Sequence, residues 1–293
     1  MARVYFLTIL AAIVFNCSGE EWFDRGRFSW KRADTLTDGI KYTHLARTSP
    51  RLMKIWAARV DLHKKFNFHT AKKAENHGEM IPTHLHRKLV IHTKRQSTAD
   101  FMTQAQQNNI PMVFAVNAAP WSPWDKIPSP YASNLGLLIS DGEMVSPARA
   151  GRPSFVVYKD GKIDLRLIAP GEDISNIAQA VSGFDFVLKS GKACGSATGL
   201  APRTGLGLSA DKRFLYLVVI DGRQPFFSMG CPTLEVGKIL AYFGAHDGLN
   251  MDGGGSSSFV IWDAATGKAR MLNQQPGNRV RGVGASLGIS LGD

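Results

Sequence analysis

The chain has 293 residues, of which 44% are hydrophobic and 20% are charged. This balance indicates a globular protein with a sizeable core and excludes a disordered or fibrous chain. The 35 Lys and Arg residues outnumber the 24 Asp and Glu residues, which gives a formal net charge of +11. That charge favours anionic partners: phosphorylated small molecules, acidic glycans, a membrane surface or nucleic acid.

Residues 1–19 have the layout of a secretory signal peptide. Arg3 precedes an apolar run from Val4 to Phe15, and small residues follow. The run is shorter than the roughly 20 residues that cross a bilayer, and no later segment is long and apolar enough to do so. We therefore expect an exported protein, periplasmic or extracellular, with no transmembrane segment in the mature chain, residues 20–293.

The three cysteines leave two questions open. Cys17 is either removed with the signal peptide or kept as the lipid attachment site of a lipoprotein. If it is removed, Cys194 and Cys231 remain, and in an exported protein such a pair forms either a disulfide or two separate buried thiols.

Most of the predicted elements are strands joined in hairpins. Apolar runs, several of them alternating, predict strands over residues 40–42, 52–62, 112–116, 135–139, 144–145, 155–158, 163–168, 184–188, 202–208, 214–220, 259–262 and 285–291. Short turns with Asp-Gly or similar pairs connect several neighbours. This order predicts an α+β fold: a single domain of mostly antiparallel β-sheet with a few inserted helices.

Three segments are predicted to be helical. One begins at Ser97 or Thr98 and runs to residues 108–109, and another begins at Thr233 and ends at Gly244. A short third helix is expected over 173–179. The segment 273–284 reads as a loop.

A histidine-rich basic span covers residues 63–95 and holds six of the eight histidines. His84 and His86 would lie on one side of a strand, where a metal could bind them. No Cys or carboxylate stands at a suitable spacing, so we favour a solvated basic insertion and expect no metal and no cofactor.

Polar residues and two tryptophans follow the predicted strand 112–116. Asn117 stands at the strand end, and Trp121 and Trp124 come shortly after it. An exposed aromatic ring there could stack on a sugar, and the alternative is that both tryptophans pack under a loop.

The stretch from Asn250 to Ser258 places Asp252 beside three glycines and three serines. Consecutive glycines are tolerated where the backbone bends or a ligand approaches closely. We expect Asp252 to lie on a connection from the helix ending at Gly244 to the strand 259–262, where functional groups are often displayed. A plain tight turn is the alternative.

Polar side chains recur where predicted strands begin or end. They are Asn117, Arg203, Thr204, Asp221, Arg223, Asn250, Asp252 and Arg279. A guanidinium group binds two phosphate oxygens in a bidentate manner. Carboxylates serve as acid, base or cation stabiliser in glycosidic cleavage. The set suits a sugar phosphate.

These motifs together resemble the phosphodiester glycosidase family. The matching segments are Asn117-Ala, Pro202-Arg-Thr-Gly-Leu-Gly, Val219-Ile-Asp-Gly-Arg, Asn250-Met-Asp-Gly-Gly-Gly-Ser-Ser, Asn273 and Arg279. The chain departs from the family pattern at Ala119-Pro-Trp121, so we expect a reshaped wall on the sugar side.

The resemblance implies hydrolysis of the anomeric C–O bond of a sugar 1-phosphodiester, releasing free sugar and a phosphomonoester. Carried over to this chain, it implies Asp252 and Asp221 as catalytic residues. Substrate binding is expected from Asn117, Arg203, Thr204, Arg223, Asn250, Gly253, Gly254, Gly255, Ser256 and Arg279. The expected partner is a sugar phosphodiester or phosphate-containing glycan.

Two other functions fit the same sequence. One is a glycosidase that acts on an exopolysaccharide or wall polymer without phosphate, and the other is a non-catalytic binder of anionic glycans. Nucleic-acid binding is disfavoured because no matching motif accompanies the charge. No dinucleotide-binding fingerprint, phosphate-binding loop or Gly-x-Ser-x-Gly nucleophile motif is present.

Overall fold

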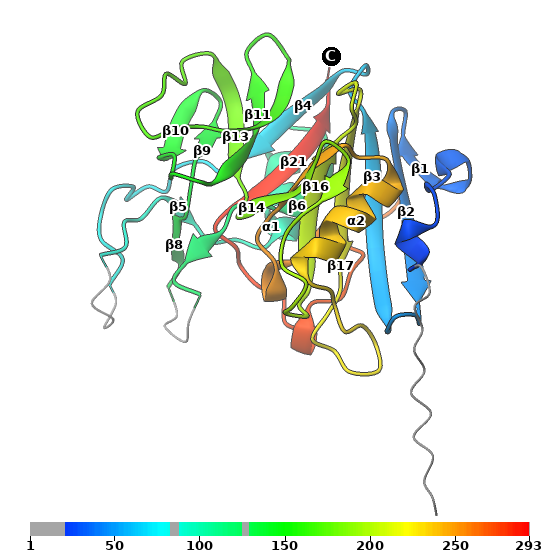
Figure 1. Cartoon of the computed structure of the whole chain (residues 1–293). Helices are drawn as coiled ribbons and strands as arrows, with labels where there is room; N and C mark the ends of the chain where they lie inside the picture. Colours follow the sequence, from blue (N-terminus) through cyan, green and yellow to red (C-terminus); the bar gives the residue numbers. More distant parts are fainter. Residues whose placement is uncertain (1–20, 83–87, 125–128, 293) are drawn as a thin grey trace, which may run out of the picture.

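Four antiparallel β-sheets and two α-helices make up the part of the chain that the structure describes (Figure 1). A computed structural model describes residues 21–82, 88–124 and 129–292. The expected signal peptide and the pair His84 and His86 lie outside these residues. None of the described helices is long and apolar enough to cross a membrane.

The largest sheet has eight strands. Their order is β1 (Asp34–Thr37), β2 (Ile40–Arg47), β3 (Met53–Asp61), β17 (Phe214–Ile220), β16 (Arg203–Leu208), β18 (Asp247–Asn250), β14 (Asp185–Lys189) and β15 (Lys192–Ala193). A five-stranded sheet faces it, with the order β20 (Lys268–Met271), β19 (Phe259–Asp263), β6 (Met112–Asn117), β21 (Ser286–Leu291) and β4 (Phe66–Thr70).

Two further sheets complete the strand inventory. A second five-stranded sheet has the order β10 (Glu143–Ser146), β9 (Leu138–Ser140), β13 (Ile177–Ser182), β11 (Pro153–Tyr158) and β12 (Ile163–Leu167). A small sheet joins β5 (Thr93–Lys94), β8 (Tyr131–Asn134) and β7 (Trp121–Ser122). Every strand pairing within these sheets is antiparallel, which confirms the expected sheet type.

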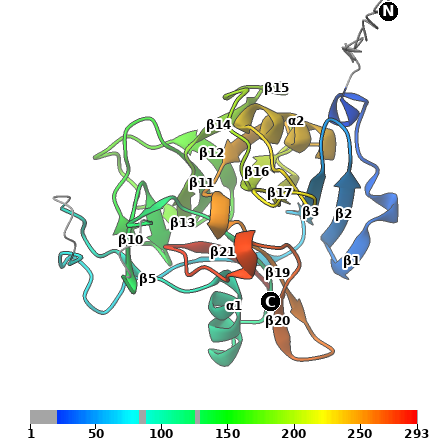
Figure 2. The ribbon, with the colours of Figure 1, turned by 90° about the horizontal axis from the view of Figure 1, so that it is seen from below.

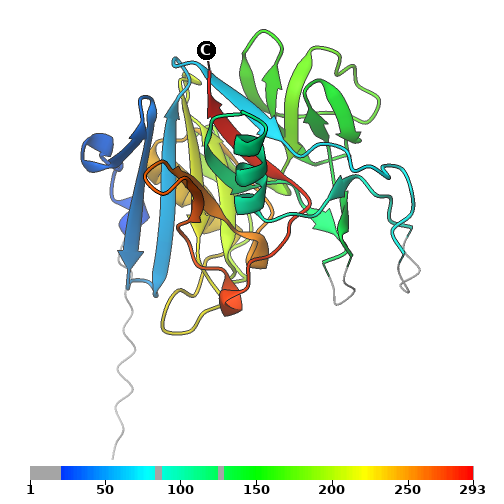
Figure 3. The ribbon, with the colours of Figure 1, turned by 180° about the vertical axis from the view of Figure 1, so that it is seen from behind.

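The helices cover the outer faces of the two facing sheets. α2 (Thr233–Phe243) packs on the eight-stranded sheet, and α1 (Thr98–Gln107) packs on β6, β19 and β20. Short 3-10 helices are η1 (Trp22–Asp24), η2 (Trp30–Arg32), η3 (Gly254–Ser256) and η4 (Pro276–Asn278). Figure 3 shows α1 lying across β21 from behind.

Alternation along the central strands explains the layers. In β17, Leu215, Leu217 and Val219 face the core between the sheets, whereas Tyr216, Val218 and Ile220 face α2. Side chains of a strand point alternately to its two faces, so an apolar residue at every position indicates a strand buried on both sides. The eight-stranded sheet therefore has a hydrophobic layer on each face, one against the facing sheet and one against α2.

The two long helices end where the sequence predicts. The Ser97 side chain caps α1 by accepting a hydrogen bond from the Asp100 backbone nitrogen at 3.0 Å. Gly244 ends α2 with a φ of 118°, a conformation that favours glycine.

The helix predicted over 173–179 is wrong. The Asp173 side chain accepts a hydrogen bond from the Ser175 backbone nitrogen in a turn, and Ile177 then begins β13, which pairs with β11. A local hydrogen bond from an Asp side chain competes with helix formation, and the sheet gives the following backbone its partners.

One other expectation is corrected. The structure places β18 between α2 and Asp252, so Asp252 lies on a strand-to-strand connection and not on a helix-to-strand one.

Of the two alternatives for the cysteines, the structure has separate thiols. Cys194 is partly buried, Cys231 is buried, and neither forms a disulfide. Burial raises the pKa of the Cys231 thiol to about 12, so this thiol is unreactive at neutral pH.

Candidate active site

Polar strand ends from both facing sheets meet at one end of the molecule. β16 begins with Arg203 opposite Ile220 of β17, and its third residue pairs with Asn250 at the end of β18. Across the core, Asn117 ends β6 opposite Ser286. Because the strands are antiparallel, these ends lie together, and η3 and η4 lie beside them, as Figure 2 shows from below.

Asn117 is the hydrogen-bonding centre of this end. Its side-chain nitrogen donates to the Asp252 carbonyl oxygen at 2.7 Å. Its side-chain oxygen accepts from the Thr204 hydroxyl at 2.7 Å and from the Ser258 backbone nitrogen at 2.9 Å. Asn117 and Thr204 are fully buried, so they fix the Asp252 loop against the sheet instead of facing a ligand.

Asp252 is partly exposed and accepts several hydrogen bonds. Trp121 donates from Nε1 to the Asp252 Oδ2 atom at 3.1 Å, and the Ser256 side chain and Gly253 backbone also donate to the carboxylate. Burial raises the pKa of Asp252 to about 6, although these bonds and the charge of Arg281 act to lower it. The carboxyl group therefore titrates near pH 6, in a range suited to acid or base chemistry.

Trp121 is buried, not exposed as one interpretation expected. It is 4% exposed, whereas Trp124 is 67% exposed. The Arg95 guanidinium lies over the Trp121 ring, with Cζ 4.3 Å from the ring centroid. Arg95 is itself held by the Gly282 and Ser129 carbonyl oxygens at 2.8–3.2 Å. A fixed chain of contacts thus runs from Arg95 through Trp121 to Asp252.

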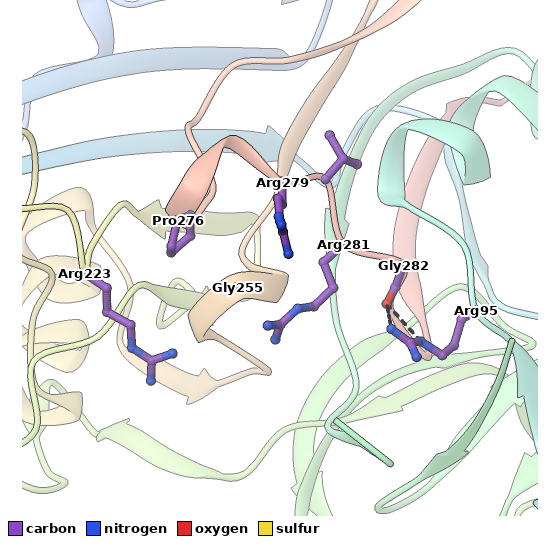
Figure 4. Close-up of a pocket in the computed structure, with 8 residues that line it drawn as sticks. Arg95, Arg223, Gly255, Pro276, Arg279, Arg281 and Gly282 are labelled. Atoms are coloured by element: carbon purple, nitrogen blue, oxygen red, sulfur yellow. Dashed lines mark hydrogen bonds between the residues drawn. The ribbon is translucent and has the colours of Figure 1, made fainter. Parts of the chain in front are cut away.

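A cavity of about 380 Å³ opens beside this chain of contacts (Figure 4). Four arginines line it: Arg95, Arg223, Arg279 and Arg281. Figure 4 shows Arg223 and Arg281 approaching from opposite sides of Gly255. Four cationic side chains around one small cavity favour an anion as its ligand, and guanidinium groups suit phosphate oxygens.

Gly255 allows Arg281 to enter the cavity. A Cβ atom at this position would lie 2.7 Å from the Arg281 Cζ atom, too close for a contact. The Gln275 side chain accepts from the Arg281 backbone nitrogen at 2.9 Å and donates to the Ser258 hydroxyl at 2.9 Å. The arginine-bearing segment is therefore tied to the Asp252 loop.

Asp221 is less exposed to solvent than Asp252. It is 1% exposed, and its Oδ1 atom accepts from Asn273 Nδ2 at 3.0 Å and from the Gln274 backbone nitrogen at 3.1 Å. Burial raises its pKa to about 6 against these bonds. Asp221 thus joins the end of β17 to the segment that continues into Arg279 and Arg281.

Arg203 and the glycine amides are engaged within the protein. Arg203 donates to the carbonyl oxygens of Cys231 at 3.0 Å and Gly199 at 2.7 Å, and it does not line the arginine cavity. The Gly254 nitrogen donates to the Pro202 carbonyl at 2.9 Å. An oxyanion site made by all three glycine amides is therefore not available.

The histidine-rich span is less solvated than expected. His69, His77 and His92 are partly buried, and the rings of His77 and His92 lie 5.9 Å apart. Burial lowers the pKa of His92 to about 4, so it is neutral at physiological pH. Among the described residues, no group of His, Cys, Asp and Glu could hold a metal ion.

Most of the predicted site residues come together, in two groups. Asn117, Thr204, Asp252, Gly253, Gly254 and Ser256 form the carboxylate loop and its supports, and Arg223, Gly255 and Arg279 line the cavity. Asn250 is buried at the end of β18. Sequence reasoning missed Arg95, which was assigned to the basic span, and Arg281, whose proximity to Arg279 was the available signal.

Comparison with known proteins places these features in a family. The phosphodiester glycosidase family model matches residues 85–290. No curated protein sequence matches the chain significantly.

Solved structures share the fold. The catalytic domain of zebrafish N-acetylglucosamine-1-phosphodiester alpha-N-acetylglucosaminidase, auto-inhibited by its pro-peptide, matches with a TM-score of 0.60 and 18% identity, over 86% of this chain and 82% of that one. A hypothetical protein from Synechocystis matches with a TM-score of 0.57 and 12% identity, over 87% of this chain and 63% of that one. A Burkholderia pseudomallei protein thought to be exported matches with a TM-score of 0.54 and 14% identity, over 82% of this chain and 74% of that one.

Proposed function

Because the chain belongs to the phosphodiester glycosidase family, we propose that it hydrolyses the anomeric C–O bond of a sugar 1-phosphodiester. The observation that carries this proposal is the arginine-lined cavity beside a carboxyl group whose pKa is about 6. The cavity supplies the phosphate site, and Asp252 supplies the proton acceptor.

The arginines bind the diester phosphate and prepare it to leave. Arg223, Arg279 and Arg281 line the cavity with exposed side chains, and their positive charge stabilises the negative charge that develops on the phosphate oxygen as the C–O bond breaks. A phosphate monoester is already a good leaving group, so a strong general acid is not required.

Asp252 activates the attacking water. In its ionised form the carboxylate accepts a proton from water while the water oxygen bonds to the anomeric carbon. The C–O bond breaks, and its electron pair leaves with the phosphate oxygen. Free sugar and a phosphomonoester result, and the proton passes to Asp252 and then to solvent.

We assign Asp221 a positioning role in place of the catalytic role that the sequence suggested. Its burial and its hydrogen bonds to Asn273 and Gln274 orient the segment that carries Arg279 and Arg281. Arg203 has a comparable role, because it holds the loops at Gly199 and Cys231.

Export and a phosphorylated glycan substrate complete the proposal. The signal-peptide layout of residues 1–19 supports export, and so does the likeness to a protein thought to be exported. The zebrafish neighbour is named for a sugar 1-phosphodiester, which supports this substrate class.

Substrate comparison with one arginine variant tests the proposal. We expect the purified protein to hydrolyse N-acetylglucosamine or hexose 1-phosphodiesters and to leave the matching phosphate-free glycosides intact. Arg281→Gln should raise KM for the diester by about tenfold or more, because a charged hydrogen bond to phosphate is lost. The exposed Arg270 on β20 gives the control variant Arg270→Gln, which should behave as the unmodified chain.

Two results would contradict the proposal. Hydrolysis of phosphate-free glycosides that is indifferent to Arg281→Gln would favour the polysaccharide-directed glycosidase. Tight glycan binding without turnover of any substrate would favour the binding protein.

A further inference from the structure

A loop beside the arginine cavity exposes an aromatic side chain to solvent. The loop covers residues 222–230, which we call the rim loop, and Phe226 at its tip is 96% exposed. Figures 1 and 3 show the rim loop next to η4 at the same end of the molecule, and Gln224 donates to the Gln274 carbonyl at 2.9 Å. The rim loop, which carries Phe226, therefore lies next to the cavity that Arg223 lines.

The rim loop is held firmly, so the exposure of Phe226 does not come from a loose segment. The Gln224 and Ser228 backbones pair with each other, with nitrogen–oxygen distances of 2.9–3.1 Å. The Ser228 hydroxyl donates to the Asp221 carbonyl at 2.6 Å, and the Met229 nitrogen donates to the Leu52 carbonyl at 2.8 Å. The Phe227 ring packs under the Lys54 ammonium at 3.6 Å.

Backbone strain supports a role for the exposed ring. Phe226 has a φ of 65° and Arg223 a φ of 56°, which is the left-handed region where a residue with a side chain is disfavoured. Strain of this kind persists where the surrounding structure enforces it, and it concentrates at functional sites. Single exposed apolar residues are common, but a strained and almost fully exposed phenylalanine on a fixed loop is not.

The rim loop and the cavity wall expose further apolar and cationic side chains. Met229 of the rim loop is 40% exposed, and Val280 on the cavity wall is 65% exposed. Arg223 of the rim loop and Arg279 and Arg281 of the cavity wall are also exposed. Neither the rim loop nor the segment 264–292 contains Asp or Glu, so no carboxylate from these segments offsets the charge.

We propose that this rim docks the protein on an anionic lipid surface, with Phe226 inserted at the headgroup level. An aromatic side chain that enters the interface, combined with cations that meet lipid phosphates, is the combination that binds peripheral proteins to such membranes. The net charge of +11 attracts the protein to the surface from a distance.

Docking in this way narrows the substrate class. The mouth of the cavity faces the lipid, so the enzyme receives sugar phosphodiesters whose alcohol part is anchored in the membrane. This step rests on the proposed function, whereas the docking itself does not.

Vesicle sedimentation tests the docking. The chain from residue 20 is the appropriate protein, because the described fold begins at residue 21 and the apolar run 4–15 would itself enter a bilayer. We expect binding to vesicles of phosphatidylcholine with about one-third phosphatidylglycerol, weak binding to phosphatidylcholine alone, and loss of binding near 0.5 M salt, where charges are screened within about 4 Å.

Phe226→Asp is the decisive variant, and it should lower the partition coefficient by about tenfold or more. Met144 on β10 is 47% exposed, and Figure 1 shows β10 far from the rim loop, so Met144→Asp serves as the matched control and should bind normally. Both variants should keep the melting temperature of the unmodified chain, which shows that they fold.

The possible failures are distinguishable. Absence of binding to anionic vesicles, or equal binding by Phe226→Asp and Met144→Asp, would overturn the docking. Normal docking without hydrolysis of any diester would overturn the proposed function and leave the docking in place.

Discussion

The hydrogen bond from Trp121 to Asp252 should set the pH at which the enzyme becomes active. Trp121→Phe keeps the apolar ring under Arg95 and removes the Nε1 donor that lies 3.1 Å from the carboxylate. Hydrogen bonds to a charged group contribute about 1.5–3 kcal/mol, and 1.36 kcal/mol corresponds to one pKa unit. The variant keeps the hydrogen bonds from Ser256 and Gly253 to Asp252. We therefore use the lower limit of this range, about 1.5 kcal/mol, for the lost bond.

The direction of the shift in the pH profile follows from the ionised form of Asp252 that the mechanism needs. Loss of a donor to the carboxylate favours the protonated acid and raises the pKa of Asp252 from about 6 to about 7. The rate should rise with pH through this value in both proteins, because the proposed mechanism uses the Asp252 carboxylate as the base. The variant should therefore need about one pH unit more to reach half of its maximal kcat/KM.

The assay is the pH profile of kcat/KM on a soluble sugar 1-phosphodiester from about pH 4 to 9. Trp262→Phe, a partly buried tryptophan on β19, is the matched control and should leave the midpoint unchanged. A midpoint that stays in place in a folded Trp121→Phe protein would refute the assignment of Asp252 as the titrating group. A rate that falls as pH rises through 6 would show that Asp252 acts as an acid.

Three further predictions concern Asp221, Gly255 and stability. Asp221→Asn keeps an oxygen that can accept hydrogen bonds from Asn273 and Gln274, so we expect the variant to retain at least about half of the normal kcat. A fall in kcat of about a thousandfold, the size expected for a catalytic group, would show that Asp221 is catalytic. Gly255→Ala should displace the Arg281 guanidinium, which a Cβ would meet at 2.7 Å, and raise KM for the diester by about tenfold with the melting temperature unchanged; an unchanged KM would contradict the phosphate role of Arg281. The pKa values of Asp221 and Asp252 are raised from 3.8 to about 6, so the folded state binds their protons more tightly than the unfolded state does. The free energy of unfolding should therefore fall as pH rises from about 4 to 6, by at most roughly 3 kcal/mol per group. Urea titrations at several pH values measure this, and Asp221→Asn should reduce the slope.

Local sequence patterns predicted much of the architecture. The uninterrupted apolar run 214–220 corresponds to β17, which is buried on both faces, and Ser97 and Gly244 mark helix ends. These features depend on nearest neighbours and on the alternation of side chains. The helix prediction for 173–179 was wrong because β13 pairs with β11, and local helix propensity does not include such a contact between residues distant in the sequence.

The site could be predicted in its residue types but not in its roles. Asp221 and Asp252 stand in similar Asp-Gly motifs, yet one is 1% exposed and the other is partly exposed, and only packing distinguishes them. The contact between Arg95 and Trp121 joins the residue after β5 to the strand β7, and β8 lies between these two strands in the small sheet. No periodicity along the chain reveals such a contact.

Hydrolysis of a sugar 1-phosphodiester in water labelled with oxygen-18 tests the central claim most directly. Attack at the anomeric carbon, with Asp252 as the base, predicts that the label enters the released sugar and not the phosphomonoester. Asp252→Asn should abolish this incorporation while Arg270→Gln retains it. Label found in the phosphate would show cleavage of the P–O bond and would contradict the assignment of the enzyme as a glycosidase.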